Sequence, residues 1–248
     1  IILLLMTVWF LGYNVRGSAR WIDLGFTTIQ PAEFAKLAMI IIMAKFLDQQ
    51  GEKVKSFRYL LLSGIYVGIP TLLILIEPDL GSAIVVFLIW ISMLFFSRMN
   101  KKHLIVIFLL LAVFSVFAWN YLLHDYQKDR IYTFLDPGRD PKGSGYNVIQ
   151  SVIAVGSGGI YGRGVGRGLQ SQLKFLPERQ TDFIFASTAE ELGLLGSSII
   201  LGLFALLLFR IIRIAQKARD NFGTYLAIGI FFMFFWQILI NIGMNIGV

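Results

Sequence analysis

The sequence contains no cysteine, and only 15% of its 248 residues are charged. The absence of cysteine excludes disulfide frameworks, thiolate metal sites and cysteine nucleophiles. Soluble domains carry about 25% charged residues, so this scarcity of charge, with 56% hydrophobic residues and a mean hydropathy of +0.72, excludes an ordinary soluble enzyme. The two histidines, His103 and His124, stand at opposite ends of one apolar run and cannot share a metal ion. The composition is that of a membrane protein.

Long apolar segments account for most of the chain. A helix needs about 20 apolar residues to cross the hydrocarbon core, and the segments predict about seven membrane helices, the first of them only the end of a span. We expect these at Ile1–Tyr13, Pro31–Leu47, Tyr59–Ile76, Leu80–Ser97, Leu104–Leu123, Glu191–Phe209 and Phe222–Gly247. The predicted fold class is an all-α polytopic membrane protein, a single integral membrane domain over 1–248 with one large loop at 125–182. Because the chain begins and ends inside apolar runs, we expect it to be a fragment of a longer protein.

Lysine and arginine are unevenly divided between the two sides of the predicted membrane domain. Eleven lie on one side, and only Arg16 and Arg20 lie in the short loops of the other. The richer side holds Lys45, Lys53, Lys55, Arg58, Arg98, Lys101, Lys102, Arg210, Arg213, Lys217 and Arg219. Cytoplasmic loops carry the excess of positive charge, so the 125–182 loop is predicted to be extracytoplasmic. The net charge of +7 follows from this asymmetry and indicates contact with anionic membrane lipids, not a nucleic-acid partner.

The large loop is rich in glycine, with nine between Gly143 and Gly168. Their spacing matches neither the phosphate-binding loop nor the dinucleotide fingerprint, so nucleotide binding is not expected. Two interpretations stay open: close approach of the backbone to a lipid headgroup, and simple turn formation. Apolar residues at helical spacing predict a short interfacial helix over Tyr146–Val155.

Basic residues dominate the part of this loop from Lys142 to Arg179. They are Lys142, Arg163, Arg167, Lys174 and Arg179, against the single acid Glu178. The planar fork of arginine matches the geometry of phosphate. The loop is therefore either a solvated basic surface beside anionic lipids or a site for a substrate that bears phosphate.

Carboxylates stand at the predicted outer ends of several spans. A carboxylate that enters apolar surroundings is costly, which makes such residues candidates for function. Glu33 opens the second span, with Lys36 on the same helix face; the alternative is a plain intrahelical ion pair of small value. Asp79 precedes Leu80–Ser97; the alternative is a helix cap. Asp182 has basic neighbours before it and an apolar run after it, as a positioned base at a membrane surface would.

Several segments resemble the SEDS family of FtsW, RodA and SpoVE, in the family's order and across nearly the whole chain. The segments are Arg20–Ile22, Gln30–Lys36, Glu77–Ser82, Phe175–Ala186 and Glu190–Gly193. Gly168–Lys174 is more similar to the RodA branch than to the FtsW branch, although Gln180 stands where RodA relatives usually carry histidine. The family has ten membrane helices, of which this chain shows about seven.

The resemblance implies a peptidoglycan glycosyltransferase, a hexosyltransferase that polymerises lipid II at the outer face of the bacterial cytoplasmic membrane for cell elongation and rod shape. It implies that Asp182 is the essential catalytic residue and that Glu33 and Lys36 contribute to catalysis. We expect substrate contacts from Arg179, Asp79, Arg163, Arg167, Lys174 and Arg20. The resemblance also implies a class B penicillin-binding protein, a transpeptidase, as partner. No protein metal site is predicted, although a divalent cation (Mg or Mn) at the substrate diphosphate fits this chemistry.

The alternative function is a lipid II flippase or a non-catalytic scaffold for a penicillin-binding protein. A transporter is expected to carry polar residues near the midplanes of several spans. Here the polar residues gather at the outer ends of the predicted spans, and this distribution favours chemistry at the outer face.

Overall fold

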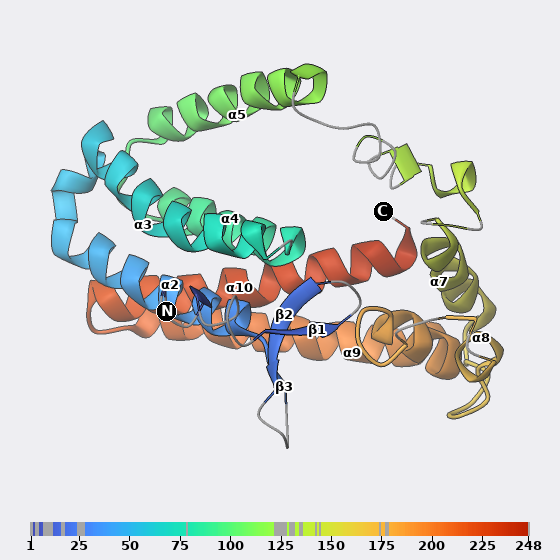
Figure 1. The fold of residues 1–248 in the computed structure, drawn as a ribbon. Coiled ribbons are helices and arrows are strands. Elements are labelled where there is room, and N and C mark those ends of the chain that lie inside the picture. Colours follow the sequence, from blue (N-terminus) through green and yellow to red (C-terminus); the bar gives the residue numbers. More distant parts are fainter. Residues whose placement is uncertain are drawn as a thin grey trace. The chain divides into compact units, whose positions relative to one another are not determined.

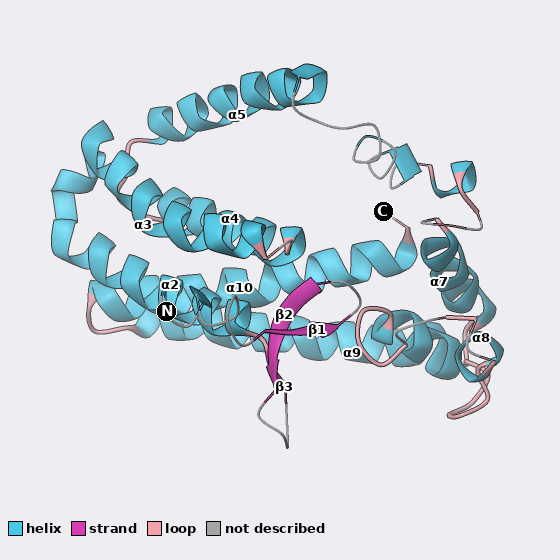
Figure 2. Ribbon diagram, viewed as in Figure 1, coloured by secondary structure: helices cyan, strands magenta, loops and turns pink. Residues whose placement is uncertain are grey.

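The chain is mostly helical in a computed structural model, with one small sheet near its start (Figures 1 and 2). The structure describes residues 2, 5–6, 12–15, 18–23, 28–77, 79–121, 128, 132–133, 136–141, 143, 145–173, 175–176 and 179–247.

Every apolar segment predicted from Pro31 onward lies in an observed helix, although the ends differ and Leu122 and Leu123 are outside the described residues. The helices are α2 (Pro31–Gln50), η1 (Gly51–Lys55), α3 (Phe57–Ile76), α4 (Leu80–Phe95), α5 (Lys101–Tyr121), η2 (Pro137–Arg139), α7 (Tyr146–Ser157), α8 (Leu169–Gln172), α9 (Ile184–Lys217) and α10 (Asn221–Ile246). The short helix predicted in the large loop is confirmed as α7.

The prediction of an all-α chain is wrong between residues 12 and 29. There β1 (Gly12–Val15), β2 (Ser18–Asp23) and β3 (Thr28–Ile29) form an antiparallel sheet in that order, with Gly12 opposite Ile22 and Ile22 opposite Ile29. Gly12 and Tyr13, predicted to end the first span, belong to this sheet; most of the rest of that span lies outside the described residues. The segment is too polar for a spanning helix, and its aromatic and β-branched residues favour strands.

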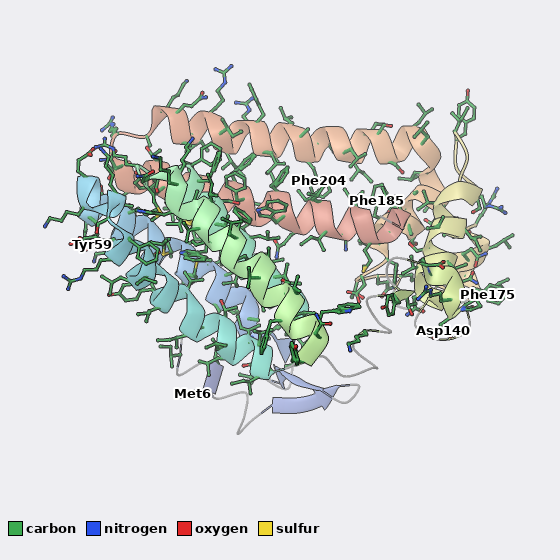
Figure 3. The ribbon with its side chains drawn as sticks, turned by 90° about the horizontal axis from the view of Figure 1, so that it is seen from above. Met6, Tyr59, Asp140, Phe175, Phe185 and Phe204 are labelled. Carbon is green, nitrogen blue, oxygen red and sulfur yellow. The ribbon has the colours of Figure 1, made fainter. Side chains whose placement is uncertain are left out.

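Three of the described helices are long and apolar enough to cross a membrane: α3, α9 and α10. Helix α4 is apolar but shorter, and the count of seven membrane helices stays a prediction. The part of α9 at residues 194–217 would by itself extend roughly 36 Å, more than the hydrocarbon core. Most of its side chains beyond Leu194 are exposed (Figure 3, where Phe204 is labelled), as expected of a surface made for lipid or for other helices.

The chain divides into two compact units, which are described separately. The first comprises Ile1–Phe108 and Leu208–Trp236, and its core packs α2, α3, α4 and the first part of α10. Helices α3 and α4 run side by side (Figure 1). A Cβ atom on Gly229 would lie 2.4 Å from a methyl carbon of Ile40, so α10 crosses α2 closely at a small residue, as helices in membranes commonly do.

Candidate functional site

Asp182 lies two residues before α9 in the second unit, which comprises Leu109–Leu207 and Gln237–Val248. The residue is exposed. Its main-chain carbonyl oxygen accepts hydrogen bonds from the side-chain amides of two α10 residues, Asn245 at 2.9 Å and Asn241 at 3.1 Å. One carbonyl oxygen has two lone pairs and can accept both. The backbone of Asp182 is therefore fixed by another helix, while the residue itself stays accessible.

Asn245 connects three helices from a fully buried position. Its side-chain oxygen accepts the main-chain N–H of Ala186 at 2.9 Å, and its main-chain oxygen accepts the hydroxyl of Ser151, on α7, at 2.7 Å. The Ala186 N–H belongs to the first turn of α9, where the helix itself offers no acceptor. Asn245 therefore caps α9 with a side chain from another helix, and it also holds Asp182, two residues before α9.

Helix α9 is interrupted at Gly193, whose φ of 66° and ψ of −165° are not helical. An interruption leaves main-chain groups without helical partners, which must be satisfied by neighbouring segments in a membrane protein. The glycine-rich segment 159–164 supplies them. Four main-chain hydrogen bonds join the two segments: Arg163 N to Glu190 O (3.0 Å), Gly164 N to Glu191 O (3.0 Å), Leu194 N to Gly159 O (2.8 Å) and Leu195 N to Ile160 O (3.1 Å).

The glycines at this junction allow two backbones to touch. A Cβ atom on Gly162 would lie 2.2 Å from the carbonyl oxygen of Glu191, and one on Gly193 would lie 2.2 Å from the nitrogen of Gly162. Both glycines also have positive φ, which other residues adopt at a cost. The sequence left open what the loop glycines do; here they bring the loop backbone against α9.

Glu190, on the first segment of α9, is a fully buried carboxylate. It accepts three hydrogen bonds: from the main-chain N–H of Gln170 at 2.9 Å, from that of Ser171 at 3.2 Å and from the Ser171 hydroxyl at 2.9 Å. A buried carboxylate is tolerated when its oxygens are hydrogen-bonded, and these donors lie in the first turn of α8. Glu190 therefore anchors the loop after Gly168 to α9.

The predicted basic residues of the loop fall into two kinds. Arg179 is half-buried and donates to the main-chain oxygen of Ser171, so it shares the anchoring region of Glu190. Arg163 and Arg167 are exposed, and Arg163 Nε donates to the carbonyl of Ser157 at 3.2 Å. Lys174 lies outside the described residues. Arg163 and Arg167 thus present exposed guanidinium groups to an anion.

Asp79 caps α4 in the first unit, as the alternative interpretation predicted. Its Oδ1 accepts the main-chain N–H of Ser82 at 3.1 Å, and its Oδ2 accepts the side-chain amide of Gln30 at 2.8 Å. Gln30 immediately precedes α2, so this contact brings the starts of α2 and α4 together. Asp79 is 6% exposed, and its capping role does not require a substrate.

Glu33 and Lys36 form the predicted ion pair in the first turns of α2, with 2.6 Å between Nζ and Oε1. The environments of the partners differ: Lys36 is 2% exposed, whereas the Glu33 side chain is 51% exposed. A plain surface pair would leave both groups in water. Burial of the ammonium group favours the functional interpretation, because a buried charge is costly to keep.

The remaining predicted residue is Arg20, whose backbone lies in β2 and whose side chain is not described. In the part of the chain that the structure describes, no three His, Asp or Glu side chains are grouped as a metal site. The structure thus defines two groups of predicted residues, Asp182 with the loop arginines in one unit and Glu33, Lys36 and Asp79 in the other.

The asparagines that hold Asp182 were not predicted from the sequence. They lie in an apolar run, where hydropathy averages over a window and hides single polar residues. The signal was present as Gln237, Asn241 and Asn245, spaced four residues apart and therefore on one helix face. Glu190 was named only within the Glu190–Gly193 segment that resembles the family, and its anchoring role was not predicted, because its partners Gln170 and Ser171 lie about twenty residues earlier.

Comparison with known proteins identifies the family to which this chain with its three membrane-capable helices belongs. The sequence model of the FtsW, RodA and SpoVE family, described as "Cell cycle protein", matches residues 1–248. The fold is that of a polytopic membrane protein. The chain belongs to the FtsW/RodA/SpoVE family.

Among curated proteins, the chain is 43% identical over 247 residues to "Peptidoglycan glycosyltransferase MrdB" of Escherichia coli K12, covering 100% of this chain and 66% of that protein. Among solved structures, it resembles one described as "Structural coordination of polymerization and crosslinking by a peptidoglycan synthase complex", with a TM-score of 0.83, 30% identity and coverage of 100% of this chain and 68% of that chain. It also resembles the Thermus thermophilus rod shape determining protein RodA, with a TM-score of 0.65, 26% identity and coverage of 98% and 62%. The chain thus spans about two thirds of these relatives.

Proposed function

We propose that the full-length protein is a peptidoglycan glycosyltransferase that polymerises lipid II. The observation that carries this proposal is the exposed Asp182 at the start of a membrane-capable helix, with its backbone held by a buried amide. The name of the E. coli relative, to which the whole chain is similar, supports the same activity.

In the proposed reaction, Asp182 is the general base. The C4 hydroxyl of one N-acetylglucosamine attacks C1 of the N-acetylmuramic acid at the end of the growing strand. A C–O bond forms at C1, the bond from C1 to the diphosphate oxygen breaks, and undecaprenyl diphosphate leaves with the bonding electron pair. The hydroxyl proton passes to the Asp182 carboxylate. A sugar hydroxyl is a weak nucleophile, and general-base assistance typically contributes about 10²–10⁴-fold in rate.

The leaving diphosphate requires cationic stabilisation. Arg163 and Arg167 support this role because both are exposed on the loop that docks against α9. Glu33 and Lys36, the ion pair of the other unit, are proposed to contribute to catalysis. The described residues offer no ligand cluster for a divalent cation, so we derive no step through one.

We further propose that the active site faces outward across the bacterial cytoplasmic membrane and serves cell elongation. The bias of eleven basic residues to two supports this orientation. For the partner we propose a class B penicillin-binding protein, because the solved structure with a TM-score of 0.83 is described as a complex that coordinates polymerization with crosslinking.

The test is a gel assay of glycan strands made by the purified full-length protein, with and without its partner, from lipid II. We expect a ladder of strands. Lipid II that lacks the C4 hydroxyl on N-acetylglucosamine is the matched control and should give none, because it cannot act as acceptor. Failure to form strands from intact lipid II, together with movement of lipid II across vesicle membranes, would favour the flippase alternative.

A further inference from the structure

We propose that Asn241 and Asn245 are positioning residues for Asp182, an amide clamp through which α10 sets the orientation of the catalytic base. This inference rests on the proposed function, since it gives Asp182 the role of base. The clamp is defined by the two amides and the single carbonyl oxygen that they share.

The clamp uses the Asn245 amide group fully. An asparagine side chain offers two N–H donors and one carbonyl acceptor. Asn245 Nδ2 donates to the carbonyl oxygens of Asp182 and of Asn241, the latter at 2.7 Å, while its Oδ1 accepts from Ala186. The residues before and after the start of α9 are therefore bound to one fully buried side chain.

Holding the Asp182 carbonyl also directs its side chain. Two hydrogen bonds on one carbonyl fix the plane of the peptide that follows Cα, and the capped amide of Ala186 fixes the first turn of α9. The direction in which Cβ leaves the backbone is then determined. Catalytic groups must be held within about 0.5 Å of the productive geometry, and an error of about 1 Å can cost 10²-fold in rate.

Asn241 offers the sharper variant, because it is half-buried and does not bind the Ala186 amide. Asn241→Asp keeps the shape of the side chain but replaces its donor with an acceptor, which repels the Asp182 carbonyl. Asn241→Gln keeps a donor on a longer stem. A purely structural role at this position would make the two variants differ in stability alone.

The kinetic test uses the full-length protein with its partner and lipid II. We expect Asn241→Asp to lower kcat at least about tenfold with KM within about twofold, because substrate binding survives and the base is misplaced. Asn241→Gln should recover most of kcat. A kcat for Asn241→Asp that matches wild type, or a loss confined to KM, would overturn the inference.

A second readout does not depend on activity. Hydrogen exchange should be at least about tenfold faster in peptides covering 183–190 in Asn245→Leu than in wild type. Ser151→Ala is the matched control, because it removes one buried hydrogen bond to Asn245 without touching Asp182 or Ala186, and it should leave that exchange unchanged.

Strand synthesis and hydrogen exchange distinguish a failure of the proposed function from a failure of the clamp. If wild type makes no strands, the proposed function fails, and exchange alone decides the clamp. Equal exchange in Asn245→Leu and wild type would overturn the clamp, even in a protein that polymerises lipid II.

Discussion

Single residues: the Glu33–Lys36 ion pair places a buried ammonium group beside a carboxylate that is half-exposed. Removing the lysine charge therefore leaves Glu33 hydrated, not stranded in an apolar interior. An ion pair that exists for stability alone would gain little from burying one partner, since replacing buried charges with apolar side chains is often neutral or stabilising. The burial of Lys36 is therefore more consistent with a role in catalysis than with a role in stability alone.

We predict that Lys36→Met lowers strand synthesis by the full-length protein at least about tenfold and leaves its apparent melting temperature in detergent unchanged or higher. Lys45→Met is the matched control, because Lys45 is an exposed lysine on the same helix; its activity should stay within about twofold of wild type. Strand synthesis by Lys36→Met at the wild-type rate would return the pair to a structural role.

Helices and loops: the interruption of α9 depends on the glycine-rich loop that docks against it. The break at Gly193 and the loop at Gly162 form a single junction, because a Cβ atom on Gly193 would meet the nitrogen of Gly162 and one on Gly162 would meet the carbonyl oxygen of Glu191. Main-chain hydrogen bonds on both sides of Gly193 connect the loop to both parts of α9. The first part of α9, which begins beside Asp182, is thereby fixed to the loop.

We predict that Gly193→Ala destabilises the protein by at least about 2 kcal/mol, because positive φ strains alanine by about 1–3 kcal/mol and the new methyl would contact the Gly162 backbone. Gly202→Ala lies in the same helix with open space around the position and should be neutral or stabilising by up to about 1 kcal/mol. Melting temperatures of the two variants in one detergent check this. Equal melting temperatures would mean that the junction is absent.

The sequence predicts those parts of the fold that depend on local pattern. Apolar runs predicted α2, α3, α4, α5, α9 and α10, and the spacing of apolar residues predicted α7. The break at Gly193 was not predictable, because it depends on a contact with a loop thirty residues earlier in the chain. The clamp on Asp182 was missed for a related reason: its donors lie about sixty residues later, inside a run that hydropathy classes as apolar.

Whole molecule: the orientation in the membrane decides which chemistry the site can meet, and it stays a prediction from charge asymmetry. Val165, 77% exposed, lies on the glycine-rich loop, and Gln49 is exposed near the end of α2. In a cysteine-free background, a membrane-impermeant maleimide should label Val165→Cys in spheroplasts, and Gln49→Cys only after permeabilisation. Labelling of both before permeabilisation would contradict the orientation.

The role of Asp182 is tested most directly by lipid II polymerisation with the full-length Asp182→Asn variant beside wild type. The substitution keeps size and most hydrogen bonding, and it leaves the main-chain carbonyl that Asn241 and Asn245 hold, so membrane insertion and partner binding should survive. Asp136→Asn, an exposed aspartate earlier in the same loop, is the matched control and should retain activity. We predict a loss of about 10²–10⁴-fold for Asp182→Asn. A rate within about tenfold of wild type, below that range, would contradict its role as base.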